Sequence, residues 1–103
     1  MTNGSRYERR LKEKLEREGY FVVRSAGSFA MDLLAVKDGE CFVYEVKSTK
    51  SDVFYFDKRC KEQLRKLQEL KRFGIAPMFA VYFKRKGWRI VSPNENIIKL
   101  DFI

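Results

Sequence analysis

The sequence predicts an α/β protein with a central mixed β-sheet flanked by helices. Two segments, 5–18 and 57–72, have helical periodicity, and strand-like segments lie between them and after them. The second helical segment stands between strands and can act as a crossover, which makes the strands that it joins parallel. At 103 residues, 45% of them hydrophobic, the chain suits a single domain over 1–103 with one core.

The first half of the chain is predicted to form one helix and three strands. Tyr7, Leu11 and Leu15 are spaced by four, which gives the helix an apolar stripe, and Gly19 is placed to end it. The strand-like runs are 20–24, 33–36 and 41–48, and the small residues of 25–28 indicate a tight loop after the first strand.

The second and third strands are predicted to form a β-hairpin. Asp38-Gly39 lies between two apolar runs and is a strong hairpin signal. If the turn centres on this pair, residues whose numbers sum to about 77 face each other. Asp32, at the start of the second strand, then lies directly opposite Glu45, although a register slip of one residue would break this pairing.

The second half is predicted to form a helix and a second hairpin. A polar and aromatic loop over 49–56 leads to Asp57, which can cap a helix that continues to about Arg72. Strands over 78–83 and 88–91 flank a basic turn at 84–87. The tail from 93 to 103 has no firm assignment.

Composition favours a polyanionic partner. Lys and Arg number 22 against 14 Asp and Glu, which gives a formal charge of +8 and a pI near 9.7. A nucleic-acid-binding protein and an ordinary basic protein both fit this charge. Histidine is absent and the two cysteines lack a CxxC spacing, so a zinc finger and a His-based triad are excluded. No apolar run resembles a signal peptide or a membrane span, so we expect a cytoplasmic protein without a membrane partner.

Asp32, Glu45 and Lys47 form the candidate catalytic constellation. Glu45 and Lys47 are two apart on one strand and share a face, and Asp32 joins them from the facing strand. Two neighbouring carboxylates favour either a raised pKa or a bound hard cation such as Mg²⁺, with the Val46 carbonyl as a further oxygen ligand. Lys47 could stabilise charge on a phosphate. The alternative is a solvated Glu-x-Lys ion pair, but these charges interrupt strands that are otherwise apolar, where they are costly without a purpose.

Glu8 is a third candidate acid, on or beside the inward face of the first helix. It fits two roles equally well. It could join the metal site, or it could complete a capping box with Ser5 at the start of the helix.

Basic residues near these acids are candidate DNA contacts: Arg9, Arg10, Arg24 and Lys50. A solvated surface is the commoner fate of any single Lys or Arg. The aromatic run Phe54-Tyr55-Phe56 is interpreted as core or dimer contact in preference to base stacking.

Several segments together resemble the archaeal-type Holliday junction resolvases, nucleases with the restriction-endonuclease-like PD-(D/E)xK fold. Arg6-Tyr-Glu-Arg-Arg-Leu11 is similar to the N-terminal acidic helix of that family, and 19–28 is similar to its strand and catalytic loop. Met31-Asp-Leu-Leu-Ala35 and Tyr44-Glu-Val-Lys-Ser48 resemble its metal motif, and Gly87-Trp-Arg89 fits a later strand.

This resemblance implies a function and a set of site residues. The function is Mg²⁺-dependent hydrolysis, with Mn²⁺ as a substitute ion, by a homodimer that makes paired nicks in a four-way DNA junction. Asp32 and Glu45 match metal ligands, Glu8 the additional acid, and Lys47 the catalytic lysine. Ser28, or alternatively Ser25, matches a serine beside the site, and Arg9 and Arg24 match DNA contacts.

The sequence departs from the family pattern at two places. Phe29-Ala-Met31 replaces a more basic stretch, and the chain stops soon after Trp88, which puts the family's dimer contact there in doubt. Two alternative functions remain: another PD-(D/E)xK endonuclease of repair or restriction type, and a non-catalytic DNA-binding protein.

Overall fold

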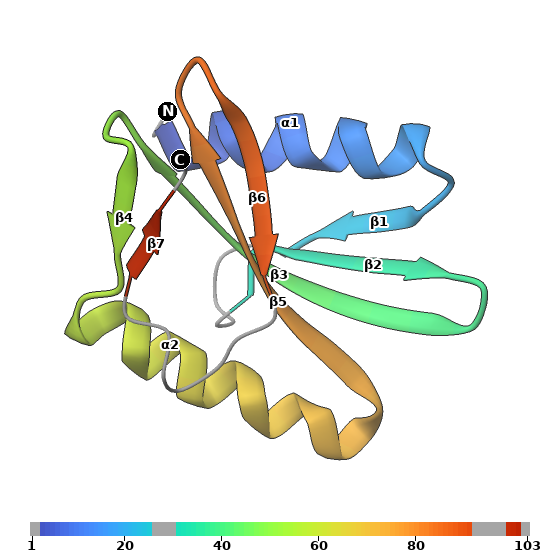
Figure 1. Cartoon of the computed structure of the whole chain (residues 1–103). Helices are drawn as coiled ribbons and strands as arrows, with labels where there is room; N and C mark the ends of the chain where they lie inside the picture. Colours follow the sequence, from blue (N-terminus) through green and yellow to red (C-terminus); the bar gives the residue numbers. More distant parts are fainter. Residues whose placement is uncertain (1–2, 26–30, 92–98, 102–103) are drawn as a thin grey trace.

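The protein is a five-stranded mixed sheet with a long helix on each face (Figure 1). The computed structural model describes the backbone of residues 3–25, 31–91 and 99–101, and the side chains of 6–25 and 31–91. In chain order the elements are α1 (Asn3–Arg17), β1 (Phe21–Arg24), β2 (Leu33–Lys37), β3 (Glu40–Thr49), β4 (Val53–Tyr55), α2 (Lys58–Gln68), the 3₁₀ helix η1 (Glu69–Phe73), β5 (Ile75–Phe83), β6 (Gly87–Val91) and β7 (Lys99–Asp101).

The strand order of the main sheet is β1-β2-β3-β5-β6. β3 and β5 are parallel, and the other neighbouring pairs are antiparallel. A parallel pair requires a crossover, and α2 with η1 supplies it between β3 and β5. The predicted fold class, a mixed sheet between helices, is confirmed.

The β2–β3 hairpin has the predicted turn and the predicted register. Asp38 and Gly39 both have positive φ angles, 52° and 80°, as the two central residues of a tight hairpin turn of the mirror-image type require. The paired residues, such as Leu33 with Tyr44 and Lys37 with Glu40, have numbers that sum to 77. Continuing this register by one residue places Asp32 opposite Glu45.

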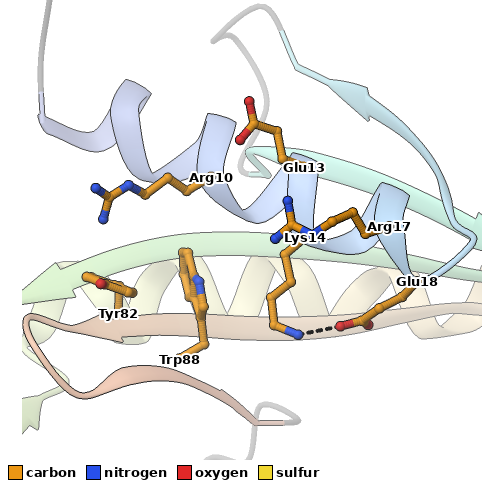
Figure 2. Close-up of a pocket in the computed structure, with 7 residues that line it drawn as sticks. All are labelled: Arg10, Glu13, Lys14, Arg17, Glu18, Tyr82 and Trp88. Atoms are coloured by element: carbon orange, nitrogen blue, oxygen red, sulfur yellow. Dashed lines mark hydrogen bonds and ion pairs between the residues drawn. The ribbon is translucent and has the colours of Figure 1, made fainter.

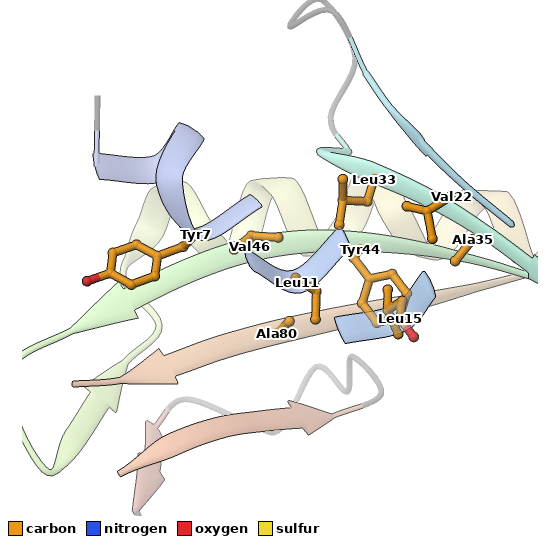
Figure 3. Close-up of a cluster of buried hydrophobic side chains, with 9 residues drawn as sticks. All are labelled: Tyr7, Leu11, Leu15, Val22, Leu33, Ala35, Tyr44, Val46 and Ala80. Carbon is orange, nitrogen blue, oxygen red and sulfur yellow. The ribbon is translucent and has the colours of Figure 1, made fainter. Parts of the chain in front are cut away.

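α1 covers one face of the sheet through the predicted apolar stripe. Tyr7, Leu11 and Leu15 are buried and pack on β-strand side chains that include Tyr44 and Val46 (Figure 3). Residues four apart lie on the same face of an α-helix, which explains why all three reach the core. Tyr44 and Val46 therefore point toward α1, and Glu45 and Lys47 point to the opposite face.

α2 covers that opposite face. Asp57 caps it as predicted, because its side-chain oxygen accepts a hydrogen bond from the Cys60 backbone N–H at 2.9 Å. Cys60, Leu64 and Leu67 are buried on the sheet. The predicted helix to Arg72 continues as the tighter η1 after Gln68, and Gly74 ends it with a φ of 78°.

The structure corrects three local expectations. α1 begins at Asn3, so Ser5 lies inside the helix and the capping box with Glu8 is wrong. The segment 49–56 is not all loop, because β3 extends through Thr49 and β4 pairs with β7 in a two-stranded sheet. The strand predicted from Met78 begins at Ile75, and Pro77 lies within it, where β6 does not pair with it. Ser28 and Phe29 lie outside the described residues.

No helix in the described ranges is long and apolar enough to cross a bilayer. Both cysteines are free thiols, Cys41 partly buried and Cys60 buried.

Candidate active site

Asp32 is fixed against β3 by its own backbone and side chain. Its backbone N–H donates to the Tyr44 carbonyl oxygen at 2.8 Å, and its Oδ2 accepts a hydrogen bond from the Val46 N–H at 2.8 Å. Its carbonyl oxygen accepts from the Ser25 N–H at 2.9 Å, which ties the end of β1 to the same place. Three bonds therefore hold the carboxylate where β2 begins.

Glu45 is the one buried charged side chain of the described residues, only 5% exposed. Its neighbour across the parallel pair is the fully buried Phe79. Burial, the negative charge of Asp32 and a hydrogen bond with Asp32 together raise the pKa of Glu45 to about 8, with burial as the largest cause. Lys47 acts in the other direction. Without a cation, this carboxyl group therefore holds a proton near neutral pH.

Glu8 reaches the same site from α1. Its Oε1 lies 3.3 Å from the Arg24 Nη2, so an ion pair joins α1 to β1. Partial burial raises the pKa of Glu8, as do the charge of Asp32 and a hydrogen bond with it, and Arg24 opposes this shift. Glu8, Asp32 and Glu45 therefore form a connected row of carboxyl groups with Asp32 in the middle.

Lys47 is half-buried on β3, two residues beyond Glu45, and pairs with Val81 of β5. Burial raises the pKa of Glu45 and of Cys60, and the positive charge of Lys47 partly offsets both shifts. Hydrogen bonds with the Cys60 backbone lower the pKa of Asp57, and the charge of Lys47 adds to that shift, so all three groups lie close to Lys47. The ammonium group thus stands between the carboxylates and the N-terminal end of α2. Sequence reasoning treated Asp57 only as a helix cap and did not connect it with Lys47, because the link between β3 and α2 is a tertiary contact.

The donor set suits a hard divalent cation. Carboxylate oxygens are the ligands that Mg²⁺ and similar ions prefer, and a cation can replace the proton that burial forces onto Glu45. Asp32 and Glu45 are the residues that would hold it. No three His, Cys, Asp or Glu side chains in the described part of the chain are arranged to hold one ion by themselves. Glu8 is turned to Arg24 here, which makes it a neighbour of the pair instead of an equal third ligand.

The predicted DNA contacts have different surroundings. Arg9 and Lys50 are exposed, whereas Arg24 forms an ion pair with Glu8. The Arg10 guanidinium lies 5.5 Å from the ring centroids of both Tyr7 and Tyr82, on the flank of α1 that faces β5 and β6.

Comparison with known proteins assigns the family. The family model of the archaeal Holliday junction resolvases (Hjc) matches residues 1–101. The chain belongs to this family. It is 42% identical over 80 residues to the crossover junction endodeoxyribonuclease Hjc of Methanocaldococcus jannaschii, a match that covers 78% of this chain and 59% of that relative.

A solved structure of Hjc from Archaeoglobus fulgidus, described as a Holliday junction resolvase from an archaeal hyperthermophile, has the same fold. Its TM-score is 0.79 at 28% identity, over 97% of this chain and 84% of that one. This chain therefore has the restriction-endonuclease-like fold. Nucleases of this family generally use a divalent metal ion, which agrees with the donor set of Asp32 and Glu45.

Proposed function

We propose that this protein is a structure-selective endonuclease that resolves four-way DNA junctions by Mg²⁺-dependent phosphodiester hydrolysis, with Mn²⁺ as a substitute ion. The observation that carries the proposal is the buried Glu45 carboxyl group beside Asp32, with Lys47 two residues further along the same strand. A charged group in a sheet core is costly unless a partner compensates it, and the compensating partner of a paired carboxylate is a cation. The names of the related proteins support the junction as substrate.

The chain's residues then have separable roles. Asp32 and Glu45 would hold the ion through carboxylate oxygens on fixed strand positions. When bound, the ion would supply Lewis-acid chemistry for hydrolysis of the scissile phosphate. Lys47 stabilises negative charge that develops on the phosphate while water adds to phosphorus and a sugar hydroxyl departs.

Glu8 and Arg24 act beside this centre. Their ion pair holds the start of α1 to the end of β1, so that Arg24 presents its guanidinium at the mouth of the site. Arg9, Arg10 and Lys50 add positive charge that attracts the phosphate backbone. The family resemblance also gives Ser28 a catalytic role, and this residue lies outside the described part of the chain.

The active form is a homodimer in the cytoplasm of a prokaryotic cell or a virus-infected host cell. Paired nicks on opposing strands of one junction need two active sites, and the described residues of one chain contain one such carboxylate pair. A two-fold axis matches the symmetry of a four-way junction.

The test is cleavage of an end-labelled four-way junction beside a linear duplex of equal length, in Mg²⁺ and in EDTA. Paired symmetric nicks in the junction only, abolished by EDTA, are the expected result. Cutting of both substrates would indicate a general endonuclease on the same fold, and binding without cutting would indicate a non-catalytic junction-binding protein. Either of these outcomes overturns the proposal.

A further inference from the structure

A pocket of about 450 Å³ lies between α1 and the β5–β6 hairpin, and none of Glu8, Asp32 and Glu45 lines it. Figure 2 shows the side chains that line it: Arg10, Glu13, Lys14, Arg17, Glu18, Tyr82 and Trp88. Its volume lies in the range of pockets that hold small organic ligands. Of the residues that line it, only Arg10 has a part in the proposed function, as one of the basic residues that attract the phosphate backbone.

Two aromatic rings form the wall of the pocket on the sheet. Tyr82 and Trp88 are paired across β5 and β6, and their rings contact edge to face, with centroids 5.1 Å apart and an interplanar angle of 62°. Tyr82 also stacks on the buried Tyr7 at 5.0 Å, so the wall is anchored to the core. Trp88 is only partly buried, which leaves ring surface for a ligand.

Cations of α1 form the opposite wall. The Arg10 guanidinium lies over the Tyr82 ring, and Lys14 is paired with Glu18 one turn further on. Arg17 has no ion-pair partner among the residues that the structure describes, and Glu13 points away from the two rings (Figure 2). Arg10 and Arg17 are therefore available to an anion, whereas Lys14 is already neutralised.

The pocket and the active site lie on opposite flanks of α1. Glu8 faces β1, where it meets Arg24, and Arg10 and Arg17 face β5 and β6. At 1.5 Å per residue, Arg17 is about 14 Å along the helix from Glu8. Because the helix is also about 10–12 Å across, a DNA strand that contacts both sites has to pass around α1.

We propose that this pocket binds an unstacked nucleotide, with its base against Trp88 and Tyr82 and its phosphate between Arg10 and Arg17. Aromatic faces beside positive charge are the combination by which proteins bind single-stranded nucleic acid, because every base can stack and every nucleotide carries a phosphate. The inference rests on the proposed function and deepens it, since it adds a preference for branched DNA that has unpaired nucleotides near the branch.

The test uses the fluorescence of Trp88, which is the single tryptophan of the chain. The full-length protein is titrated in EDTA, where it does not cleave, with a short single-stranded oligothymidine and with a blunt duplex of equal length. We expect the single strand to quench Trp88, and the duplex, whose bases are stacked, to quench it much less.

Variants then separate the pocket from general electrostatics. Arg17→Gln should weaken binding of the single strand several-fold and reduce the slope of log K against log salt by about 0.7, the value for one lost phosphate contact on a single strand. Arg65→Gln, an exposed arginine on α2 outside the pocket, is the matched control and should change neither the quenching nor, in Mg²⁺, junction cleavage.

The proposal is overturned if the single strand does not quench Trp88, or if Arg17→Gln and Arg65→Gln bind it alike. It is also overturned if the fluorescence changes with protein concentration alone, because the pocket would then be an interface between copies of the chain. Cleavage of a fully paired junction by the unmodified protein is measured separately. If the unmodified protein does not cleave this junction, the proposed function is wrong. If it cleaves the junction but the single strand does not quench Trp88, only the nucleotide pocket is wrong.

Discussion

The carboxyl group of Glu45 has the least favourable surroundings of any charged residue in the described structure. It lies in the middle strand of the sheet, beside Phe79 and opposite Asp32, where ionisation is opposed by burial and by like charge. This cost to stability is the reason that we propose a role for the residue in binding the cation and not in stabilising the fold. Two consequences can be measured on single residues.

The first consequence is a dependence of stability on pH. The pKa of Glu45 is about 8 in the folded state against 4.5 ordinarily, so the folded state binds the proton more tightly than the unfolded state. This contribution to stability is fully present below pH 4.5 and is lost as pH rises through 8. In EDTA, Glu45→Gln should therefore be more stable than the unmodified protein at pH 9, by up to about 5 kcal/mol, and the difference should shrink toward pH 5.

Urea denaturation of both proteins at pH 5, 7 and 9 measures this difference. Mg²⁺ should restore stability to the unmodified protein at pH 9 and leave Glu45→Gln unchanged. A difference between the two proteins that is the same at all three pH values would show that Glu45 is not protonated in the fold.

The second consequence concerns Glu8. Because α1 begins at Asn3, Glu8 does not cap the helix, and its ion pair with Arg24 is partly exposed. Glu8→Gln should lower the free energy of unfolding by less than about 1 kcal/mol. Cleavage should fall by roughly 10- to 100-fold, because the charge beside Asp32 is altered.

Glu16→Gln is the control for Glu8→Gln. It removes an exposed ion pair with Lys12 from the same helix, at a distance from the carboxylates. If Glu8→Gln and Glu16→Gln cleave the junction at the same rate, Glu8 has no role in cleavage.

The elements show which parts of the structure were accessible from sequence. The β2–β3 hairpin follows from local chemistry, since Asp38-Gly39 accepts positive φ and the alternating strands fix the register. This one hairpin brings Asp32 and Glu45 together, so the centre of the site could be predicted from turn position and arithmetic.

Elements that depend on distant partners could not be predicted. β4 forms by pairing with β7, nearly 50 residues away, and the first residues of β5 pair only with β3. The ion pair of Glu8 with Arg24 and the pocket at Trp88 likewise join separate elements. A single sequence carries no local signal for such contacts, because their free energy comes from tertiary packing.

The turn at Asp38-Gly39 sets the register between β2 and β3. Gly39 has a φ of 80° with open space where a Cβ would lie, so Gly39→Ala would meet conformational strain and no clash. We expect a loss of about 1–2 kcal/mol in the free energy of unfolding, with cleavage per folded molecule nearly unchanged. Thermal unfolding together with junction cleavage measures both quantities. Unchanged stability would mean that the turn adopts another conformation.

At the scale of the whole molecule, charge and architecture complement each other. In the proposed function, the net charge of +8 draws the protein to DNA without specifying a position on it. The sheet places the candidate carboxylate pair at the start of β2, with α1 on one face and α2 on the other (Figure 1). On this proposal, affinity is spread over the basic surface, and cleavage depends on a few residues at one point.

The separation of DNA binding from cleavage is tested most directly with the Glu45→Gln variant, whose junction binding and junction cleavage are measured side by side. We expect cleavage of a four-way junction in Mg²⁺ to fall by at least about 1,000-fold, while the Kd for the junction in a gel-shift assay stays within about threefold of the unmodified protein. Glu62→Gln, which changes an exposed glutamate of α2, should leave both quantities unchanged. Retained cleavage, or a loss of binding as large as the loss of cleavage, would contradict the assignment of Glu45 to the catalytic metal site.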